Sequence, residues 1–235
     1  MAKYQILITA LIVLSMFGIV TSVAFGEVVF LLAEWLVNGS GVTEIIGVGA
    51  VSSGELLLED TKTIVGKMMV LCSGIFDETI KTNGTGVVWE LLSLSGVAIG
   101  SSALGASALS CVDQENCESP KVWTVNLLWT TELVLMEESG ASYFARLITL
   151  LKSGWYVECT VLGIKGSDEC LAEGSVAEAR NVMSGVELVT SEAFTELAGL
   201  KLATCTSSKE QSGIIEGSII EQAAASGASL SVSSE

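Results

Sequence analysis

An alternation of apolar and polar residues marks the stretch from Trp155 to Cys170. One face of its first half carries the apolar side chains Trp155, Val157, Cys159 and Val161. The Gly-Ser-Asp sequence at 166–168 is typical of a turn, and a second cysteine follows it. The stretch therefore predicts a half-buried strand that runs into a turn at 166–168, with one cysteine on each limb.

A hairpin is predicted earlier in the chain. The apolar run from Met68 to Ile75 is typical of a strand buried on both faces. Asn83-Gly84 suits a type I′ turn, and Val87 to Leu94 predicts the returning strand. Near the end of the chain, apolar residues alternate with serines, so residues 226–233 predict an edge strand.

Composition favours strands over helices, because Val, Leu, Ile and Thr are common. We predict a mainly β fold, an antiparallel sandwich or barrel with few short helices. Ala177–Met183 is a candidate for one or two helical turns, and Tyr143–Leu151 for a strand or a short helix. Residues 27–235 are expected to form a single domain, and the best candidate for a sub-boundary is the Gly-, Ser- and Ala-rich segment near 96–110.

Residues 1–26 have the three parts of a secretory signal peptide: one basic residue near the start, an apolar middle and an exit of small residues. The apolar segment is also long enough to cross a bilayer, which takes about 20 residues. The alternatives are a cleaved signal and an uncleaved anchor, of which we favour the first. Either one predicts a secreted or cell-surface protein that touches the membrane only through residues 1–26, and only if they are retained.

The six cysteines are an even number behind an export signal, which predicts disulfides. Sequence distance favours three pairs: Cys111 with Cys117, Cys159 with Cys170, and Cys72 with Cys205. The third bridge would tie the first half of the domain to the last. No Cys-x-x-Cys pair is present, which disfavours a cysteine-based metal site.

The chain carries 27 acidic and 11 basic residues and no histidine, for a net charge of −16. Without a cluster of Lys and Arg it is not expected to bind nucleic acid. The absence of histidine excludes Ser-His-Asp and Cys-His nucleophiles and histidine zinc sites. We therefore predict no catalytic, cofactor-binding or metal-binding residues, and a protein that is not an enzyme.

Two weaker candidates for chemistry each have a simpler interpretation. Paired carboxylates, as glycosidases use, occur at turn signals where acidic residues are usually solvated: Glu59-Asp60, Glu137-Glu138 and Asp168-Glu169. The loop from Asp113 to Asn116 offers oxygen ligands for calcium, but a solvated loop is the simpler interpretation.

Aromatic residues and two asparagines leave further alternatives. The five tryptophans could form a carbohydrate-stacking face or pack in the core: Trp35, Trp89, Trp123, Trp129 and Trp155. Three of them sit among alternating apolar residues, which favours core packing. Asn38 and Asn83 match the N-glycosylation pattern. Each precedes a glycine, so we favour the turn interpretation for both.

Five short sequence segments together resemble those of a known protein family: Ala33-Glu34-Trp35-Leu36, residues 54–62, Leu71-Cys72-Ser73-Gly74, residues 122–129 and Ala203-Thr204-Cys205-Thr206. With them the chain resembles a family of secreted, cysteine-paired proteins of unknown function predicted in soil actinobacterial genomes. The likeness covers most of the chain after residue 26 and implies export and paired cysteines. Family members have a proline and a histidine where this chain has Leu128 and Thr130, so no role of that histidine carries over.

These features predict a secreted or cell-surface structural protein that self-assembles into a coat or filament through edge strands such as 226–233. A second hypothesis is an extracellular carbohydrate- or cation-binding module. A third is a carboxylate-based hydrolase, which requires two acids to converge in one cleft.

Overall fold

The computed structural model describes residues 23–25, 28–43, 47–92, 98–99, 110–126, 129–138, 141–148, 153–172, 174–225 and 227–234. The predicted signal or anchor lies outside these residues except for 23–25, and the predicted sub-boundary lies outside them except for 98–99 and 110. Within the described residues, no helix has the length and hydropathy that crossing a membrane requires.

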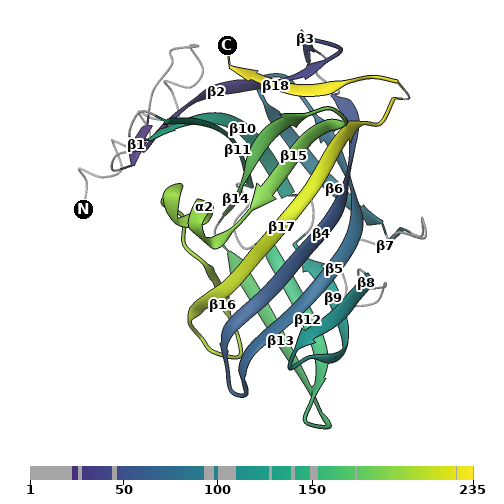
Figure 1. Cartoon of the computed structure of the whole chain (residues 1–235), viewed down its shortest axis with the longest axis vertical. Coiled ribbons are helices and arrows are strands. Elements are labelled where there is room, and N and C mark those ends of the chain that lie inside the picture. Colours follow the sequence, from purple (N-terminus) through teal and green to yellow (C-terminus); the bar gives the residue numbers. More distant parts are fainter. Residues whose placement is uncertain are drawn as a thin grey trace, which may run out of the picture.

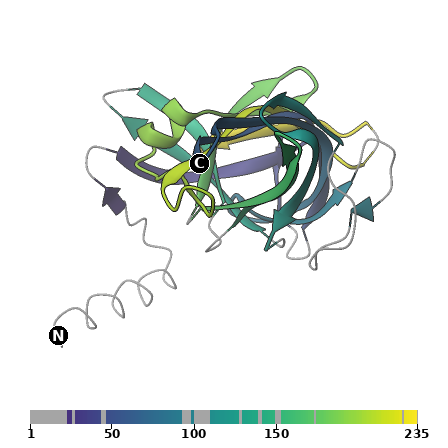
Figure 2. The same cartoon turned by 90° about the horizontal axis from the view of Figure 1, so that it is seen from below.

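Eight antiparallel strands close a barrel. Their pairings form one circle, in the order β4 (Val48–Thr63), β5 (Gly66–Ile80), β6 (Thr85–Leu92), β10 (Trp129–Glu138), β11 (Ala141–Ile148), β14 (Ser175–Val182), β15 (Gly185–Thr190), β17 (Gln211–Ala223) and β4 again. Seen from below, the strands curve round into a ring (Figure 2). The structure thus confirms the predicted mainly β, antiparallel fold, in its barrel form.

Three long strands extend below this circle. β4, β5 and β17 have 16, 15 and 13 residues and run diagonally down the molecule (Figure 1). In the lower half five further strands lie between β5 and β17: β8 (Ser110–Glu115) pairs with β5, and β9 (Glu118–Val125), β12 (Ser153–Val161), β13 (Ile164–Ala172) and β16 (Ala203–Cys205) pair in that order, with β16 joined to β17. β8 and β9 are in contact. The interior is therefore continuous from the upper to the lower half.

Two glycines let the long strands β4 and β17 cross closely. A Cβ at Gly54 would meet the Ser218 carbonyl oxygen, and a Cβ at Gly217 would meet the Glu55 carbonyl oxygen. Gly217 also has a φ of 140°, which L side chains rarely adopt. The pair marks the place where the sheet bends into a barrel.

The remaining elements lie at the upper end and on the sides of the barrel (Figure 1). β2 (Val28–Val37) pairs with β10 and also with β1 (Val23–Phe25), β3 (Ser40–Gly41) and β18 (Leu230–Ser234), whereas β7 (Ala98–Ile99) pairs with β6. The helix α2 (Glu192–Leu197) lies beside β14 (Figure 1), and its N-cap Ser191 accepts a hydrogen bond from the Phe194 N–H at 3.1 Å. Its sequence signal is confined to the N-cap serine, because six residues are too few to show a helical period of apolar positions.

Both predicted hairpins, the one at Asn83-Gly84 and the one within residues 155–170, are present. Asn83 and Gly84 have φ values of 57° and 70°, positive as a type I′ turn requires, and they connect β5 to β6. The alternating face of β12 is also confirmed, because Trp155, Val157 and Cys159 are all buried.

The turn position in the second hairpin was predicted wrongly. Residues 166–168 lie in β13, and the turn is Leu162-Gly163, since Val161 pairs with Ile164. Leu162 has a φ of 50°, a conformation that leucine rarely adopts, so the turn carried no recognisable sequence signal.

Replacing Leu162 by asparagine should stabilise the protein. Leu162 is 85% exposed, so its side chain contributes little burial, whereas its left-handed backbone is unfavourable. We expect Leu162→Asn to raise the free energy of unfolding by about 1 kcal/mol, measured by urea denaturation. The matched control is Ile64→Asn in the β4–β5 turn, where the side chain is 94% exposed but φ is not positive. Equal urea midpoints for Leu162→Asn and Ile64→Asn would contradict the expected stabilisation at position 162.

The helical interpretation of Ala177–Met183 was also wrong. Residues up to Val182 belong to β14, which pairs with β11 on one side and β15 on the other. The two neighbouring strands override the helix propensity of its alanines. Of the two alternatives for Tyr143–Leu151, the strand is confirmed up to Ile148, and the rest lies outside the described residues.

All six cysteines form disulfides, but none of the three predicted pairs is correct. The bridges are Cys72–Cys111, Cys117–Cys159 and Cys170–Cys205. Cys159 lies opposite Gly166 and Cys170 opposite Trp155, so the two cysteines are four ladder positions apart. At about 3.4 Å per residue that separation is too long for a disulfide. Cys111 and Cys117 are separated by an extended strand, and Cys72 instead faces Cys111 directly.

Candidate functional site

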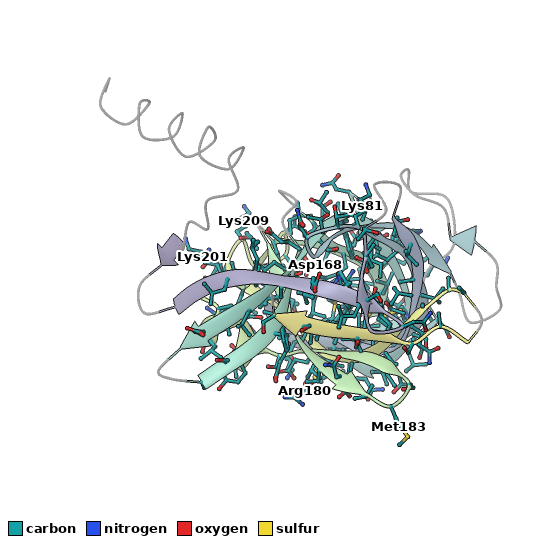
Figure 3. The ribbon with its side chains drawn as sticks, turned by 90° about the horizontal axis from the view of Figure 1, so that it is seen from above. Lys81, Asp168, Arg180, Met183, Lys201 and Lys209 are labelled. Atoms are coloured by element: carbon teal, nitrogen blue, oxygen red, sulfur yellow. A yellow bond between two sulfur atoms is a disulfide. The ribbon has the colours of Figure 1, made fainter. Side chains whose placement is uncertain are left out.

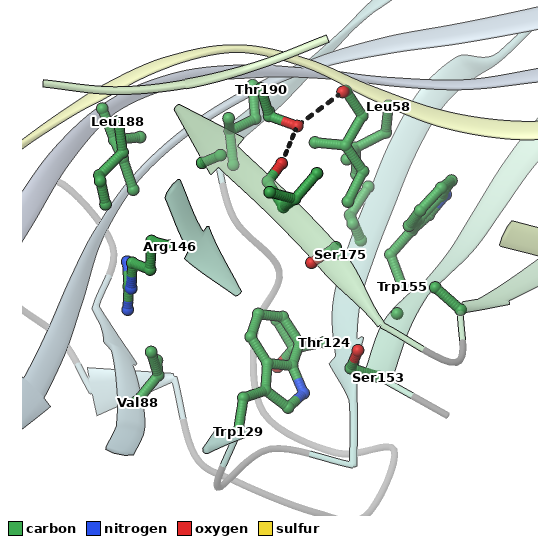
Figure 4. Close-up of a pocket in the computed structure, with 18 of the residues that line it drawn as sticks. Leu58, Val88, Thr124, Trp129, Arg146, Ser153, Trp155, Ser175, Leu188 and Thr190 are labelled. Carbon is green, nitrogen blue, oxygen red and sulfur yellow. Dashed lines mark hydrogen bonds between the residues drawn. The ribbon is translucent and has the colours of Figure 1, made fainter. Parts of the chain in front are cut away.

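An internal cavity lies where the upper and lower halves of the barrel meet. Its volume is about 130 Å³, and most of its walls are apolar. Figure 4 shows Leu188, Arg146 and Val88 on one side, Trp155 and Ser153 on the other, and Trp129 below. Ten strands contribute lining residues, so the site depends on the closed barrel: β4, β6, β9, β10, β11, β12, β13, β14, β15 and β17.

Small inward-facing residues leave this space open. At the level of the cavity, the strands β9, β12, β13 and β14 present short side chains: Thr124, Ser153, Ala172, Ser175 and Ala177. Larger side chains from the long strands, such as Leu56 and Ile219, line it from the opposite wall. Trp129 closes one side, and its indole N–H donates to the Val125 carbonyl at 3.0 Å.

The tryptophans divide into different environments. Trp35 is buried in the upper core and Trp155 in the lower one, which agrees with core packing. Trp123 pairs with Tyr156, so the two side chains share the outer face, and their ring centroids are 5.5 Å apart. The side chain of Trp89 lies outside the described residues. Of the tryptophans whose side chains the structure describes, Trp123, Trp129 and Trp155 line the cavity and Trp35 does not.

A buried charged cluster borders the upper wall of the cavity. Arg146 forms an ion pair with Glu78, and Thr131 donates to the other Glu78 oxygen at 2.6 Å. Arg146 Nη1 lies 3.9 Å from Glu221 Oε2, but neither Glu221 oxygen has a hydrogen-bond partner. All three charged residues are at most 5% exposed.

The pKa values in this cluster follow from burial. Burial first, and then the nearby Glu78 carboxylate, raise the pKa of Glu221 well above its usual range. Burial alone would lower the pKa of Arg146, but the Glu78 and Glu221 carboxylates raise it. The buried Arg146–Glu78 ion pair therefore lies beside a Glu221 carboxyl that holds its proton more tightly than an exposed carboxyl does.

Stability should fall with rising pH because of Glu221. A raised pKa means that the folded state binds this proton more tightly than the unfolded chain does. The free energy of unfolding therefore decreases as pH rises above the ordinary carboxyl value of 4.5, until the folded-state pKa is reached. We expect Glu221→Gln to remove this contribution, which has a slope of at most about 1.4 kcal/mol per pH unit. Urea denaturation from about pH 5 to about pH 8 measures it, and parallel profiles for the two proteins would contradict it.

The sequence contains only a partial signal for this cluster, which was not among the predicted sites. Glu78 stands between Asp77 and Thr79, whereas Arg146 lies between Ala145 and Leu147, and Glu221 follows Ile219 and Ile220, so these last two are charged residues beside apolar ones. Such a position is unusual unless the charge is paired inside the protein. Which charges pair, however, depends on the barrel closure that brings β5, β11 and β17 together.

Two of the predicted carboxylates converge, but away from the cavity. Asp60 on β4 and Asp168 on β13 are buried, so the expectation that they are solvated at turns was wrong. The Ser207 hydroxyl donates to Asp60 at 2.5 Å, and the Ser207 N–H donates to Asp168 at 2.9 Å. The two acids thus hold the connection between β16 and β17 in place.

The pKa values of these two acids move in opposite directions. Burial alone would raise the pKa of Asp60, but hydrogen bonds, led by that from Ser207, lower it below its usual value. Burial raises the pKa of Asp168. The sulfurs of Cys170 and Cys205 lie beside the two carboxylates but are bonded to each other, which prevents them from binding a metal.

The other predicted sites remain apart. Glu59 pairs with Lys67 at 2.7 Å, and Glu137 is exposed near the end of β10. In the proposed calcium loop, Asp113 accepts from the Cys117 N–H at 3.0 Å and the Asn116 amide donates to the Lys67 carbonyl at 2.7 Å. Asn38 and Asn83 are exposed and lie in turns.

Comparisons with known proteins do not add an assignment. No family model, no curated protein and no solved structure matches this chain. The site must therefore be interpreted from its own geometry.

Proposed function

We propose that this protein is an extracellular binding protein whose barrel takes up one small, mainly apolar molecule. The observation that carries the proposal is the cavity of about 130 Å³ with its largely apolar walls. A cavity of about 150 Å³ lined by Leu, Ile and Phe stays dry and binds benzene. Eight-stranded barrels are wide enough to hold one small ligand.

Three disulfides support a role outside the cell, where such bonds persist. The lining suits an apolar molecule better than a carbohydrate, because few of its groups are polar and the Thr190 hydroxyl is already within reach of the Val176 and Ile215 carbonyls (Figure 4). The predicted cation-binding function has no counterpart in this lining.

Self-assembly through the last strand is less well supported. Among the described strands β18 pairs only with β2, which leaves one edge for another chain. On that edge, however, the Asn181 side chain accepts from the Val232 N–H at 2.8 Å and donates to the Val232 carbonyl at 3.0 Å. An edge whose main-chain groups are already bonded is a poorer template for strand addition.

Binding of benzene, followed by calorimetry and by thermal unfolding, tests the proposal. A ligand that binds only the folded state stabilises it, by about 1.4 kcal/mol at a tenfold excess over Kd. We expect Ala177→Leu to abolish binding, because Ala177 lines the cavity opposite Arg146 on the neighbouring strand. The control Ala193→Leu adds the same atoms at an exposed position of α2 and should bind normally. Failure of the wild-type protein to bind, or equal binding by both variants, would reject the proposal.

A further inference from the structure

Three of the residues that line the cavity carry a buried hydrogen-bond donor without a partner: Trp123, Arg146 and Trp155. Trp123 packs against Tyr156 on the outer face, so the donors of inward-facing side chains are the Arg146 Nε–H on the upper side and the Trp155 indole N–H on the lower side. Arg146 is 5% exposed and Trp155 is 3% exposed, so bulk water does not satisfy either donor. Buried polar groups in folded proteins are nearly always hydrogen-bonded, which makes two such donors around one cavity unusual.

The surroundings of these donors do not provide the missing acceptor. Arg146 uses Nη2 for Glu78, and Nη1 points to Glu221 at 3.9 Å, so only Nε remains unused. Trp155 is surrounded by the lower apolar core, which includes Val122, Val157 and Cys205. An acceptor that reaches either donor must therefore be brought in by the occupant of the cavity.

The charges near the cavity decide whether that acceptor is neutral or anionic. Glu78 already balances the positive charge of Arg146, and Glu221 lies beside both. A ligand carboxylate would add another negative group to a buried site whose only described cation is paired, which is unfavourable. A neutral acceptor avoids this cost and still gains a hydrogen bond to a charged donor, which is stronger than one between neutral groups.

We propose that the ligand of this cavity is a neutral carbonyl compound with a compact apolar body, about the size of cyclohexanone. Its carbonyl oxygen accepts a hydrogen bond from Arg146 Nε or from Trp155 Nε1, and its hydrocarbon part fills the apolar space between Leu58, Leu188 and Trp129. This inference rests on the proposed function, since it names the chemistry of the same site.

Three probes of similar shape separate the possibilities: cyclohexanone, the hydrocarbon methylenecyclohexane and the anion cyclohexanecarboxylate. Calorimetry gives the Kd of each for the wild-type protein and for Trp155→Phe, Arg146→Lys and the control Trp35→Phe. Trp35 also has an unpartnered indole N–H, but it does not line the cavity. We expect Trp155→Phe or Arg146→Lys to weaken cyclohexanone about tenfold and methylenecyclohexane less than about twofold, with no effect of Trp35→Phe.

A second measurement does not depend on the folding of any variant. The C=O stretching frequency of cyclohexanone bound to the wild-type protein should lie below its value in hexane, because a hydrogen bond weakens the carbonyl double bond. Binding of the hydrocarbon together with an unshifted carbonyl frequency would overturn the carbonyl inference and leave the proposed function standing. Tighter binding of the carboxylate than of the ketone would overturn its neutrality, and no binding of any probe would overturn both proposals.

Discussion

Reduction of the three disulfides is expected to unfold the protein. The bridges close consecutive, non-overlapping loops with sequence separations of 39, 42 and 35 residues. In the chain-entropy treatment each loop of this size contributes about 4 kcal/mol, and the three together about 12 kcal/mol. A domain has a total stability of about 5–15 kcal/mol, so the reduced chain should lose its cooperative thermal transition in circular dichroism.

Removing one bridge at a time provides the control. Because the loops do not overlap, replacing any one pair by serines should cost a similar amount, about 4 kcal/mol. Peptide mapping without reduction verifies the pairs themselves and should find Cys72 with Cys111, Cys117 with Cys159 and Cys170 with Cys205. A reduced protein that still unfolds cooperatively near the oxidised melting temperature would contradict the expectation.

Replacing Arg146 by methionine should destabilise the protein by about 3–5 kcal/mol. The variant leaves Glu78 buried with Thr131 as its remaining hydrogen-bond partner and Glu221 beside it. A buried carboxylate without its cation is strongly unfavourable, and its protonation at low pH should recover part of the loss. The free energy of unfolding from urea denaturation at neutral pH gives the effect.

Arg180 is the matched control for this variant. It also contacts a glutamate, Glu178, but its side chain is 52% exposed and lies on the outer surface (Figure 3). We expect Arg180→Met to cost about 1 kcal/mol or less, because exposed pairs contribute little. Similar losses for the two variants would show that burial of the Arg146 cluster does not matter energetically.

The local elements could be predicted where side chains alternate and turns carry asparagine and glycine. The Asn83-Gly84 hairpin and the buried face of β12 follow from such patterns, because they involve neighbouring residues only. The Leu162-Gly163 turn could not be predicted in this way, since its first residue adopts a conformation that leucine disfavours.

The disulfide pairs depend on which strands are neighbours. Cys72 and Cys111 are 39 residues apart in sequence yet face each other on β5 and β8. Sequence distance favours the closest cysteines, but cysteines on one extended strand or far apart along a hairpin cannot meet. Strand order is set by the closure of the barrel, which no local pattern specifies.

The cavity could not be predicted for the same reason. Its walls combine small residues and large ones from strands that are distant in sequence, such as Leu58 on β4 and Ala177 on β14. Of the charged residues beside it, Arg146 and Glu221 are visible in the sequence as interruptions of apolar segments. Their meeting, like that of Asp60 and Asp168, follows only from the assembled barrel.

Whether the barrel takes up an apolar molecule can be seen in a crystal structure of the protein soaked with bromobenzene. The anomalous signal of bromine locates the molecule without assumptions about its pose. We expect a peak inside the barrel, enclosed by Leu58, Trp129, Trp155 and Leu188. A cavity that remains filled with ordered water at saturating bromobenzene, or a bromine peak only on the outer surface, would contradict the claim that the barrel binds small apolar molecules.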